Sequence, residues 1–272
     1  MNLLANVTIA QVDTSTTSES SAAIKIIRSD STEILQIDGQ QITKLKGNVK
    51  LYQDSVFMAC DSAIVVDRTQ LFAYDSVSIQ QGDSLVAYAE YLEYDGETRK
   101  AYLEEDVVLV SGDQQLFTQR LDYDLNTKVA SYYFGATLVT DSTQLTSRRG
   151  YYYVDEEEAF FKDSVQVNDP KFYLKADTLK FNTASQTVYF LGPTLITADT
   201  SDIYCEQGFY DTQNGLAEFS QNAQYQKDDR QAVADKIRFE DARRLYILAG
   251  NAQVRDSARY AEADTIRYFE QT

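Results

Sequence analysis

The stretch LKGNVKLYQDSVFMACDSAIVV, residues 45–66, alternates apolar and polar side chains on both sides of a central turn signal. Val49 and Leu51 share a face with Leu45, and polar residues such as Lys46 and Lys50 lie between them. A period of two is the signature of a half-buried β-strand. The stretch therefore predicts one strand, a turn and a second strand, and it raises the question of what its Cys60-Asp61 pair does.

The first half of this stretch recurs along the chain with a nearly constant period. Each copy is a short polar or glycine-containing pair followed by a small or apolar residue. The eight copies are Gly47-Asn48-Val49, Asp75-Ser76-Val77, Glu105-Asp106-Val107, Gly135-Ala136-Thr137, Asp163-Ser164-Val165, Gly192-Pro193-Thr194, Gln221-Asn222-Ala223 and Gly250-Asn251-Ala252. Their first positions differ by 28, 30, 30, 28, 29, 29 and 29 residues.

The second half of each copy has its own pattern, in which a small residue and an acid precede an aliphatic and then an aromatic side chain. The clearest copies are KADTLKFN (175–182), VADKIRFE (233–240) and EADTIRYFE (262–270). Cys60-Asp61 and Cys205-Glu206 occupy the columns of Ala176-Asp177. Cys60 and Cys205 are five repeats apart, farther than the roughly 7 Å between Cα atoms that a disulfide tolerates, so we expect two free, inward-facing thiols.

Two strands per repeat and eight repeats predict an all-β fold of about sixteen antiparallel strands, stacked into an elongated structure with a long apolar inner face. Residues 22–31 are expected to start the stack. No break in the period suggests a boundary, so residues 24–272 are predicted to form a single domain. Residues 1–23 read as the remnant of a secretion signal or as a disordered Ser/Thr-rich tail.

Composition excludes several classes of function. The chain of 272 residues has a net charge of −17, which opposes binding to nucleic-acid phosphates. It has no histidine, which removes the commonest general base and transition-metal ligand. No glycine-rich phosphate-binding loop is present, so no cofactor is predicted. These features, and the absence of a polar cluster outside the repeat, indicate that the protein is not an enzyme.

Acidic residues recur in one column of the repeat, at Asp61, Glu90, Asp177, Glu206, Asp235 and Asp264. Such a ladder of carboxylates suits Ca²⁺, but the Ala-Asp step also shifts the alternation, as a β-bulge does. The pattern favours a bend where each strand passes from one wall to the other. The arginine pairs at 148–149 and 243–244 are either phosphate contacts or part of a solvated face.

Residues 45–66 resemble the start of the OstA/LptA family of periplasmic lipopolysaccharide-transport proteins, and their Gly-Asn-Val and Cys-Asp-Ser-Ala segments are most similar to the OstA-like branch of Bacteroidetes. The resemblance extends over residues 24–272. It implies an open β-jellyroll, or β-taco, that binds lipopolysaccharide by its lipid A acyl chains in the periplasm and passes it towards the outer membrane. It also implies like-folded partners at both membranes, joined end to end. This chain is longer and more acidic than compact members of the family.

The edge strands of such a stack leave backbone groups unpaired, which invites strand addition by like-folded proteins or head-to-tail self-association. An association with the outer membrane is a further expectation. The alternative is a structural or adhesive β-solenoid scaffold of the cell envelope with a solid interior and no lipid ligand. If lipid binds, the predicted contacts are ten inward-facing residues of the apolar trough: Val49, Leu51, Val77, Ile79, Val107, Leu109, Phe161, Val165, Phe190 and Ile196.

Overall fold

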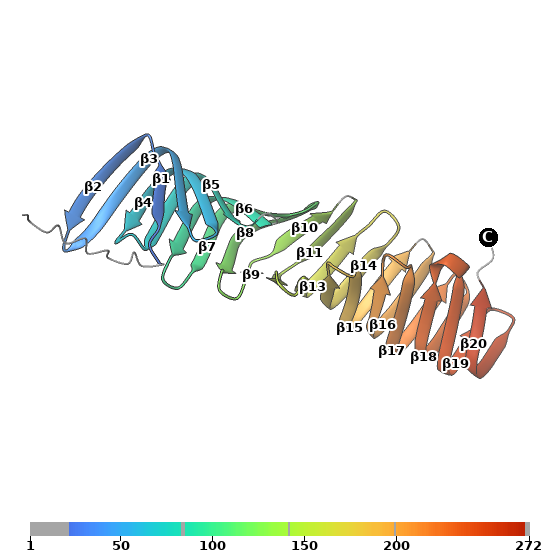
Figure 1. The fold of residues 1–272 in the computed structure, drawn as a ribbon. Helices are drawn as coiled ribbons and strands as arrows, with labels where there is room; N and C mark the ends of the chain where they lie inside the picture. The colour runs from blue at the N-terminus through green and yellow to red at the C-terminus, as the bar shows by residue number, and fades with distance from the viewer. Residues whose placement is uncertain (1–21, 83–84, 141, 199, 270–272) are drawn as a thin grey trace, which may run out of the picture.

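The computed structural model describes residues 22–82, 85–140, 142–198 and 200–269, and this part of the chain is almost entirely β-strand (Figure 1). Its first half contains β1 (Lys25–Arg28), β2 (Ser31–Ile37), β3 (Gln40–Gln53), β4 (Val56–Val66), β5 (Gln70–Gln81), β6 (Leu85–Asp95), β7 (Lys100–Ser111), β8 (Gln114–Asp124), β9 (Val129–Tyr132) and β10 (Ala136–Thr140). Its second half contains β11 (Thr143–Ser147), β12 (Arg149–Tyr153), β13 (Glu158–Asn168), β14 (Tyr173–Asn182), β15 (Thr187–Ala198), β16 (Ser201–Asp211), β17 (Leu216–Lys227), β18 (Arg230–Glu240), the 3₁₀ turn η1 (Asp241–Arg243), β19 (Leu245–Arg255) and β20 (Tyr260–Phe269).

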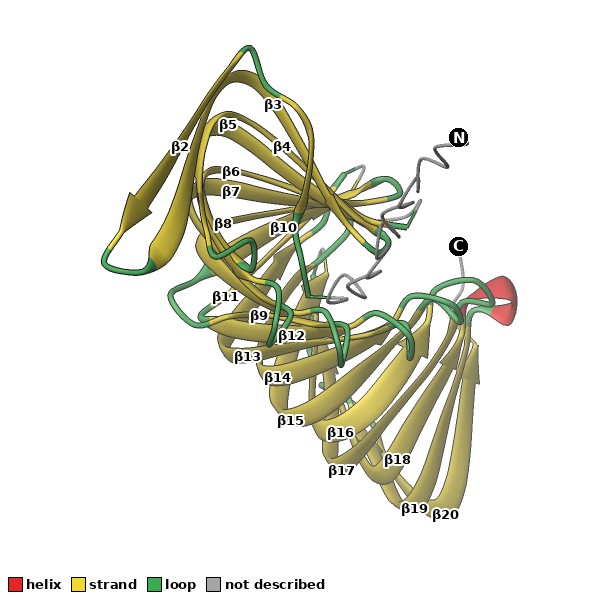
Figure 2. Cartoon of the chain, turned by 60° about the vertical axis from the view of Figure 1, so that its left-hand side comes forward, coloured by secondary structure: helices red, strands yellow, loops and turns green. Residues whose placement is uncertain are grey.

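Each long strand pairs antiparallel with the next one along the chain, from β3 to β8 and again from β13 to β20. The result is one elongated stack, in which the strands lie one behind another (Figures 1 and 2). The prediction of an all-β antiparallel stack is confirmed. The predicted first strand is also present, as β1 and β2, which both pair with β3.

The middle of the stack departs from the regular repeat. β8 pairs with β10 through residues 114–118 and with β9 through residues 122–124, so two short strands replace one long one. On the next level, β11 and β12 both pair with β13. With β9–β10 and β11–β12 each taken as one broken strand, the chain from residue 40 onward has sixteen rungs, as the repeat predicts.

A bend divides each long strand into two walls. At the bend, the odd-numbered strand carries one residue more than its partner, as in a β-bulge: Lys46 pairs with Ser62 and Val49 with Cys60, so two residues face Asp61 alone. The bulged pairs have left-handed backbones, for example Asp75 and Ser76 with φ of 62° and 53°. Glycine, asparagine and aspartate tolerate this conformation best.

The predicted bend or bulge is therefore present beside the acid, and its extra residue lies in the Gly-Asn or Asp-Ser pair of the facing strand, not at the Ala-Asp step itself. The alternation does shift at that step, since Cys60 and Ala63 are both buried and three residues apart. The acid stands opposite the bulge and accepts its side-chain hydrogen bonds. Ser76 Oγ donates to Asp61 Oδ2 over 3.1 Å, and Asn222 donates to Glu206 over 2.7 Å.

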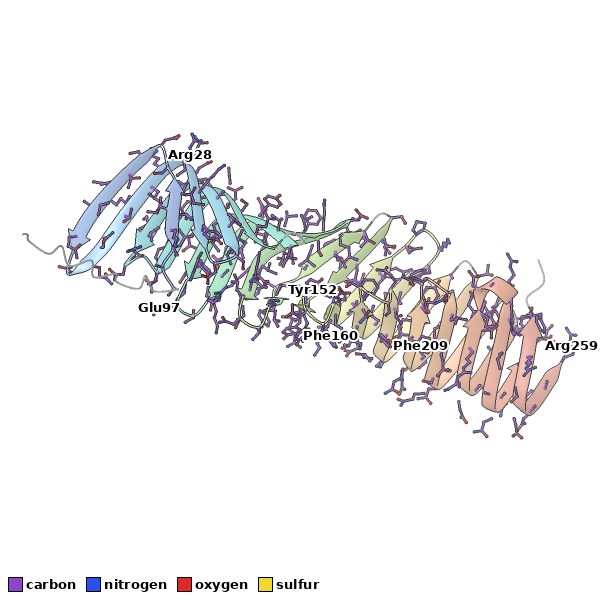
Figure 3. All side chains as sticks on the ribbon, viewed as in Figure 1. Arg28, Glu97, Tyr152, Phe160, Phe209 and Arg259 are labelled. Atoms are coloured by element: carbon purple, nitrogen blue, oxygen red, sulfur yellow. The ribbon has the colours of Figure 1, made fainter. Side chains whose placement is uncertain are left out.

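Buried apolar residues from both walls form two clusters along the axis of the stack. The first runs from Ile24 to Ala136 and the second from Ala159 to Ala252. Tyr152 packs against both clusters and lies midway along the molecule (Figure 3). Whether residues 24–272 form a single domain remains a prediction. Most of the predicted tail, 1–23, lies outside the described residues, although Ala23 at its end is buried.

Candidate lipid-binding interior

The ten residues predicted to line a trough all lie on the inner face of the walls. Nine of them are between 0% and 7% exposed, and Ile196 is half-buried. The structure divides them between the two clusters. Val49, Leu51, Val77, Ile79, Val107 and Leu109 belong to the first cluster, Phe161, Val165 and Phe190 belong to the second, and Ile196 packs against the second. The period-two pattern thus predicted the direction of these side chains, and nine of the ten are closely packed core residues.

The turns at the strand ends form two rows, which we call the lips. The first lip contains the turns that follow odd-numbered strands such as β3, β5 and β7, and the second lip contains those that follow β4, β6 and β8. Because every long strand is bent in its middle, both of its ends return to the same side of the molecule (Figure 2). A lipid that enters the interior from the side would pass between the lips.

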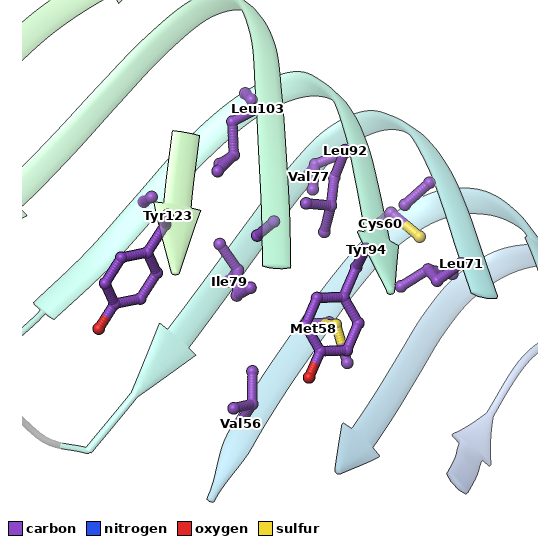
Figure 4. Packing of buried hydrophobic residues seen from close by; sticks show 14 of the residues in the cluster. Val56, Met58, Cys60, Leu71, Val77, Ile79, Leu92, Tyr94, Leu103 and Tyr123 are labelled. Carbon is purple, nitrogen blue, oxygen red and sulfur yellow. The ribbon is translucent and has the colours of Figure 1, made fainter. Parts of the chain in front are cut away.

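The two lips are joined in the N-terminal half. Gln53 Nε2 donates a hydrogen bond to the carbonyl oxygen of Gly96 over 3.0 Å, and the Gln53 side chain is buried. One residue further along the first lip, Asp54 accepts an ion pair from Arg99 over 2.6 Å. On β8, the Tyr123 hydroxyl donates to Gln81 Oε1 over 2.7 Å. These three contacts hold the walls of β3–β8 together over a filled core (Figure 4).

The N-terminal segment adds a strap across one end of this closed half. The Ile24 amide donates to the carbonyl oxygen of Arg68 in the second lip over 2.7 Å. Ala23 and Ile24 are 8% and 2% exposed. A Cβ atom on Gly96 would lie 2.5 Å from the Ala22 carbonyl oxygen, so the strap and the lip pack too closely for any other residue at position 96 without a shift.

Tyr94 lies beneath the closed lips, fully buried beside Met58 (Figure 4), and its hydroxyl group has no hydrogen-bond partner among the residues that the structure describes. Burial of an unpaired hydroxyl costs free energy. We therefore expect Tyr94→Phe to leave the free energy of unfolding unchanged or to raise it by up to about 1 kcal/mol. Tyr123→Phe, which removes the bond to Gln81, is expected to lower it by about 1 kcal/mol. Urea unfolding of the two variants measures both values; a larger loss for Tyr94→Phe than for Tyr123→Phe would contradict the assignment.

From the middle of the chain onward, the inner face near the lips is less deeply buried. Among the described residues of β13 to β16, no hydrogen bond or ion pair joins the two lips. Near the C-terminal end, the contacts between the walls include the rings of Tyr225 and Tyr246, 5.1 Å apart, and Arg230, 4.4 Å from the centre of the Tyr268 ring. The half-buried apolar side chains of this inner face are Leu138, Leu145, Tyr152, Phe181, Val188, Ile196, Ile203, Tyr210, Phe239, Tyr246, Val254 and Ile266.

An aromatic column runs along the second-lip side of this interior at a spacing of 29 residues. It consists of Tyr94, Tyr123, Tyr152, Phe181, Tyr210, Phe239 and Tyr268. Tyr94 and Tyr123 are 0% and 7% exposed, whereas the members from Tyr152 onward are half-buried. The aromatic position of the repeat was visible in the sequence, but the residues expected to contact lipid were taken from the other half of each repeat.

Two cavities mark the change between the halves. A small one, of about 50 Å³, lies where the closed half ends, and its lining includes Leu116, Tyr132, Leu138, Tyr152 and Phe161. A larger one, of about 510 Å³, follows the bend of the strands in the middle of the molecule. Its lining is mixed and consists of Asp106, Val107, Val108, Phe117, Thr118, Gln119, Gly135, Ala136, Thr137, Thr146, Ser147 and Ser164.

The acidic column lies on the outside of the bend, away from the apolar interior. Within the described ranges, no three histidine, cysteine or acidic side chains come together as ligands for a metal ion. Arg149 follows Arg148, which holds the column position in this repeat, and it pairs with Asp163 of the bulge in β13. This arginine is therefore part of the bend. The interior itself is apolar and suits a hydrocarbon ligand.

Both cysteines are free and buried, as predicted. Burial raises the pKa of Cys60 to about 11 and that of Cys205 to about 12. The thiolate is the reactive form of cysteine, so neither side chain is suited to nucleophilic chemistry. The described residues also contain no helix that is both long and apolar enough to cross a membrane.

Comparison with known families identifies the chain. The family model described as OstA-like protein matches residues 21–177, which is more than half of the sequence. The chain belongs to the OstA-like protein family. A second model, described as LptA/(LptD N-terminal domain) LPS transport protein, matches residues 144–272. Together the two matches cover the closed half and the half-buried inner face, and they confirm the predicted relationship to the OstA/LptA family.

Among solved structures, the OstA-like chain is similar to LptH, described as the LptA homologous periplasmic component of the conserved lipopolysaccharide transport device from Pseudomonas aeruginosa. The two sequences are 18% identical, the match covers 38% of this chain and 79% of LptH, and the TM-score is 0.35. No curated protein matches the chain. The prediction that the protein is not an enzyme agrees with its membership in a family of transport proteins.

Proposed function

We propose that this OstA-like protein acts in the periplasm, where it binds lipopolysaccharide by its acyl chains and carries it towards the outer membrane. The observation that carries this proposal is the apolar inner face, which runs through the stack and is half-buried between the lips from Leu138 onward. Burial of each methylene group stabilises a bound acyl chain by about 0.8 kcal/mol. An extended apolar face therefore retains a multi-acylated lipid that water would expel.

The ends of the stack support the proposed partners. Within the described part of the chain, β2 at one end and β20 at the other each pair with neighbours on one side, as edge strands do. Both carry exposed apolar side chains, including Ile34, which is 65% exposed, and Phe269, which is 60% exposed. We infer that like-folded transport proteins of the two membranes, or further copies of this chain, add to these edges. An association with the outer membrane and membership of the Bacteroidetes branch belong to the same proposal.

The predicted contact residues differ in how accessible they are to an acyl chain that enters between the lips. Ile196 and the aromatic column from Tyr152 to Phe239 are accessible near the lips, so they are the first contacts that an entering acyl chain meets. Phe161, Val165 and Phe190 form the floor beneath them. The six predicted residues of the N-terminal half contact lipid only if their walls separate, because all six are packed beneath joined lips.

Photo-crosslinking in cells tests the proposal. The photoreactive residue p-benzoyl-phenylalanine at position 196, on the inner face, is expected to form at least tenfold more lipopolysaccharide adduct than at position 195. Leu195 is the matched control, because it precedes Ile196 on β15, faces outward and is 42% exposed. Adduct yield is measured on immunoblots with antibodies to lipopolysaccharide. Equal yields at positions 195 and 196, or no adduct at either, would overturn the proposal.

One observation favours the alternative of an envelope scaffold without a lipid ligand. The interior of β3–β8 is filled by its own side chains, with Leu51, Leu71, Leu92 and Leu103 at 0% exposure. A solid stack of this kind is what a purely structural role requires. The same crosslinking experiment separates the two functions, because a scaffold leaves position 196 without lipid adducts.

A further inference from the structure

The same repeat produces two different interiors in this protein. Tyr94 and Tyr152 occupy the same column of the repeat, two periods apart, yet Tyr94 is fully buried and Tyr152 is half-buried. Their neighbours on the inner face are apolar in both cases. The repeat itself does not account for the difference. The difference in burial between the two tyrosines coincides with the contacts between the lips, which are present over β3–β8 and absent among the described residues of β13–β16.

The joined lips leave little space for a ligand in the N-terminal half. The buried apolar side chains on the inner face of β3–β7 are at most 7% exposed, and a closely packed interior admits a new group only if the packing is displaced. An acyl chain can therefore occupy this half only after its walls separate. Three side-chain contacts oppose that separation: Gln53 with Gly96, Arg99 with Asp54, and Tyr123 with Gln81.

We propose that these three contacts form a latch, which admits lipopolysaccharide acyl chains to the N-terminal half only when it is released. This inference rests on the proposed transport function and adds a regulated step to it. With the latch closed, lipid is confined to the inner face from Leu138 onward. With the latch open, the interior becomes continuous from β3 to β20. Contacts of a like-folded partner with the lips or with the strap at Ala23–Ile24 are a means of releasing it.

The nature of the contacts suits a latch. Each is polar and lies at the rim of the core, so it can exchange its partner for water when the walls part. The core beneath contributes apolar surface that an acyl chain can replace. Tyr94 adds a further element, because its unpaired hydroxyl makes the closed state less stable than the same packing with a phenylalanine.

The chain carries a natural position for a probe of the closed interior. Met58 is 3% exposed on the inner face of β4. The only other methionine of the sequence is Met1. Photo-methionine fed to the expressing cells therefore places a diazirine at position 58 with almost no change of shape. An Ile196→Met variant in a Met58→Leu background places the same probe on the half-buried inner face. Peptide mapping by mass spectrometry assigns each lipopolysaccharide adduct to its position.

The test compares the purified full chain with a latch variant, Arg99→Gln/Tyr123→Phe, after incubation with lipopolysaccharide. The matched control is Lys128→Gln, which removes an ion pair of 2.7 Å to Asp155 between neighbouring turns of a single lip. The latch variant is expected to increase the adduct at position 58 at least fivefold, while the adduct at position 196 changes less than twofold. The control is expected to leave both unchanged.

A second arm holds the lips closed. In an Asp54→Cys/Arg99→Cys variant, a short bismaleimide that joins the two thiols is expected to abolish the adduct at position 58. The same reagent in a Lys128→Cys/Asp155→Cys variant is expected to have no effect. The buried thiols of Cys60 and Cys205 do not compete for the reagent. An adduct at position 58 that is equal in all variants, or that survives the cross-lip link, overturns the latch alone. Loss of adducts at both 58 and 196 in every sample overturns the transport function as well.

Discussion

A Gly150→Ala variant is expected to lose about 3 kcal/mol of the free energy of unfolding, because an added methyl group overpacks the middle of the stack. A Cβ atom at position 150 would lie 2.4–2.5 Å from the ring of Tyr132, closer than any real contact. The ring has little room to retreat. Tyr132 is 4% exposed, and its hydroxyl shares a hydrogen bond with the buried Ser147. The packing of the Tyr132 ring therefore requires glycine at position 150.

Thermal unfolding measures this effect, and a fall in Tm of about 6–12 °C is expected for a chain of this size. The double variant Gly150→Ala/Tyr132→Leu is the control, since leucine removes the ring that the methyl group meets. Its loss of stability is expected to be smaller than the sum of the two single losses. Strict additivity would show that the two residues are not in steric conflict and would refute the explanation.

Alkaline pH is expected to destabilise the protein by roughly 8 kcal/mol between pH 9 and pH 11, on the basis of about 1.4 kcal/mol per unit of pKa shift. Desolvation raises the pKa of Tyr94, Tyr123 and Tyr132 from 10.0 to about 12. It raises the pKa of Cys60 from 9.0 to about 11, and that of Cys205 to about 12. In all five groups, burial favours the neutral, protonated form.

The sign follows from this common cause. Below about pH 8, all five groups are protonated in both the folded and the unfolded chain, so the folded state carries no penalty. As the pH rises from 9 towards 12, the unfolded chain ionises first, and each ionisation stabilises the unfolded state. The free energy of unfolding therefore falls across this window, and urea unfolding at a series of pH values measures the fall.

Cys60→Ala/Cys205→Ala provides the matched variant for this prediction. Alanine already occupies the same column at Ala89, Ala176 and Ala234, so the substitution is expected to be tolerated at neutral pH. Without the thiols, loss of stability is expected to begin near pH 10 instead of pH 9, because only the tyrosines remain. A stability that stays constant up to pH 11 in the wild-type chain would contradict the burial of these groups.

Much of the fold follows from local features of the sequence. The alternation around Val49 and Leu51 predicts strands because side chains of a strand point to opposite faces with a period of two. The 29-residue repeat predicts the number of rungs, since each repeat supplies two strands. The left-handed positions were present as Gly47-Asn48 and Asp75-Ser76, but they were interpreted only as markers of the repeat. Their role as bulges depends on which strand faces them.

The candidate site was less predictable, for a physical reason. Direction towards the inner face is a local property of a strand, so all ten proposed contacts were placed inside correctly. Depth of burial depends on how far apart the two walls stand, and that distance is set by contacts between residues such as Gln53 and Gly96, 43 positions apart. No periodic pattern marks these contacts, because each occurs once in the chain.

The sequence by itself determined an all-β stack, its family and the apolar character of its inner face, since each of these depends on neighbouring residues or on the repeat. It also indicated that Cys60 and Asp61 of the opening stretch are structural, one a small inward residue and the other a residue of the bend, whereas the bulge whose hydrogen bond Asp61 accepts was seen only in the structure. Only the tertiary structure decided where the interior is closed and where it is accessible. That difference arises from single long-range contacts across the lips, whose partners come together only when the walls have folded.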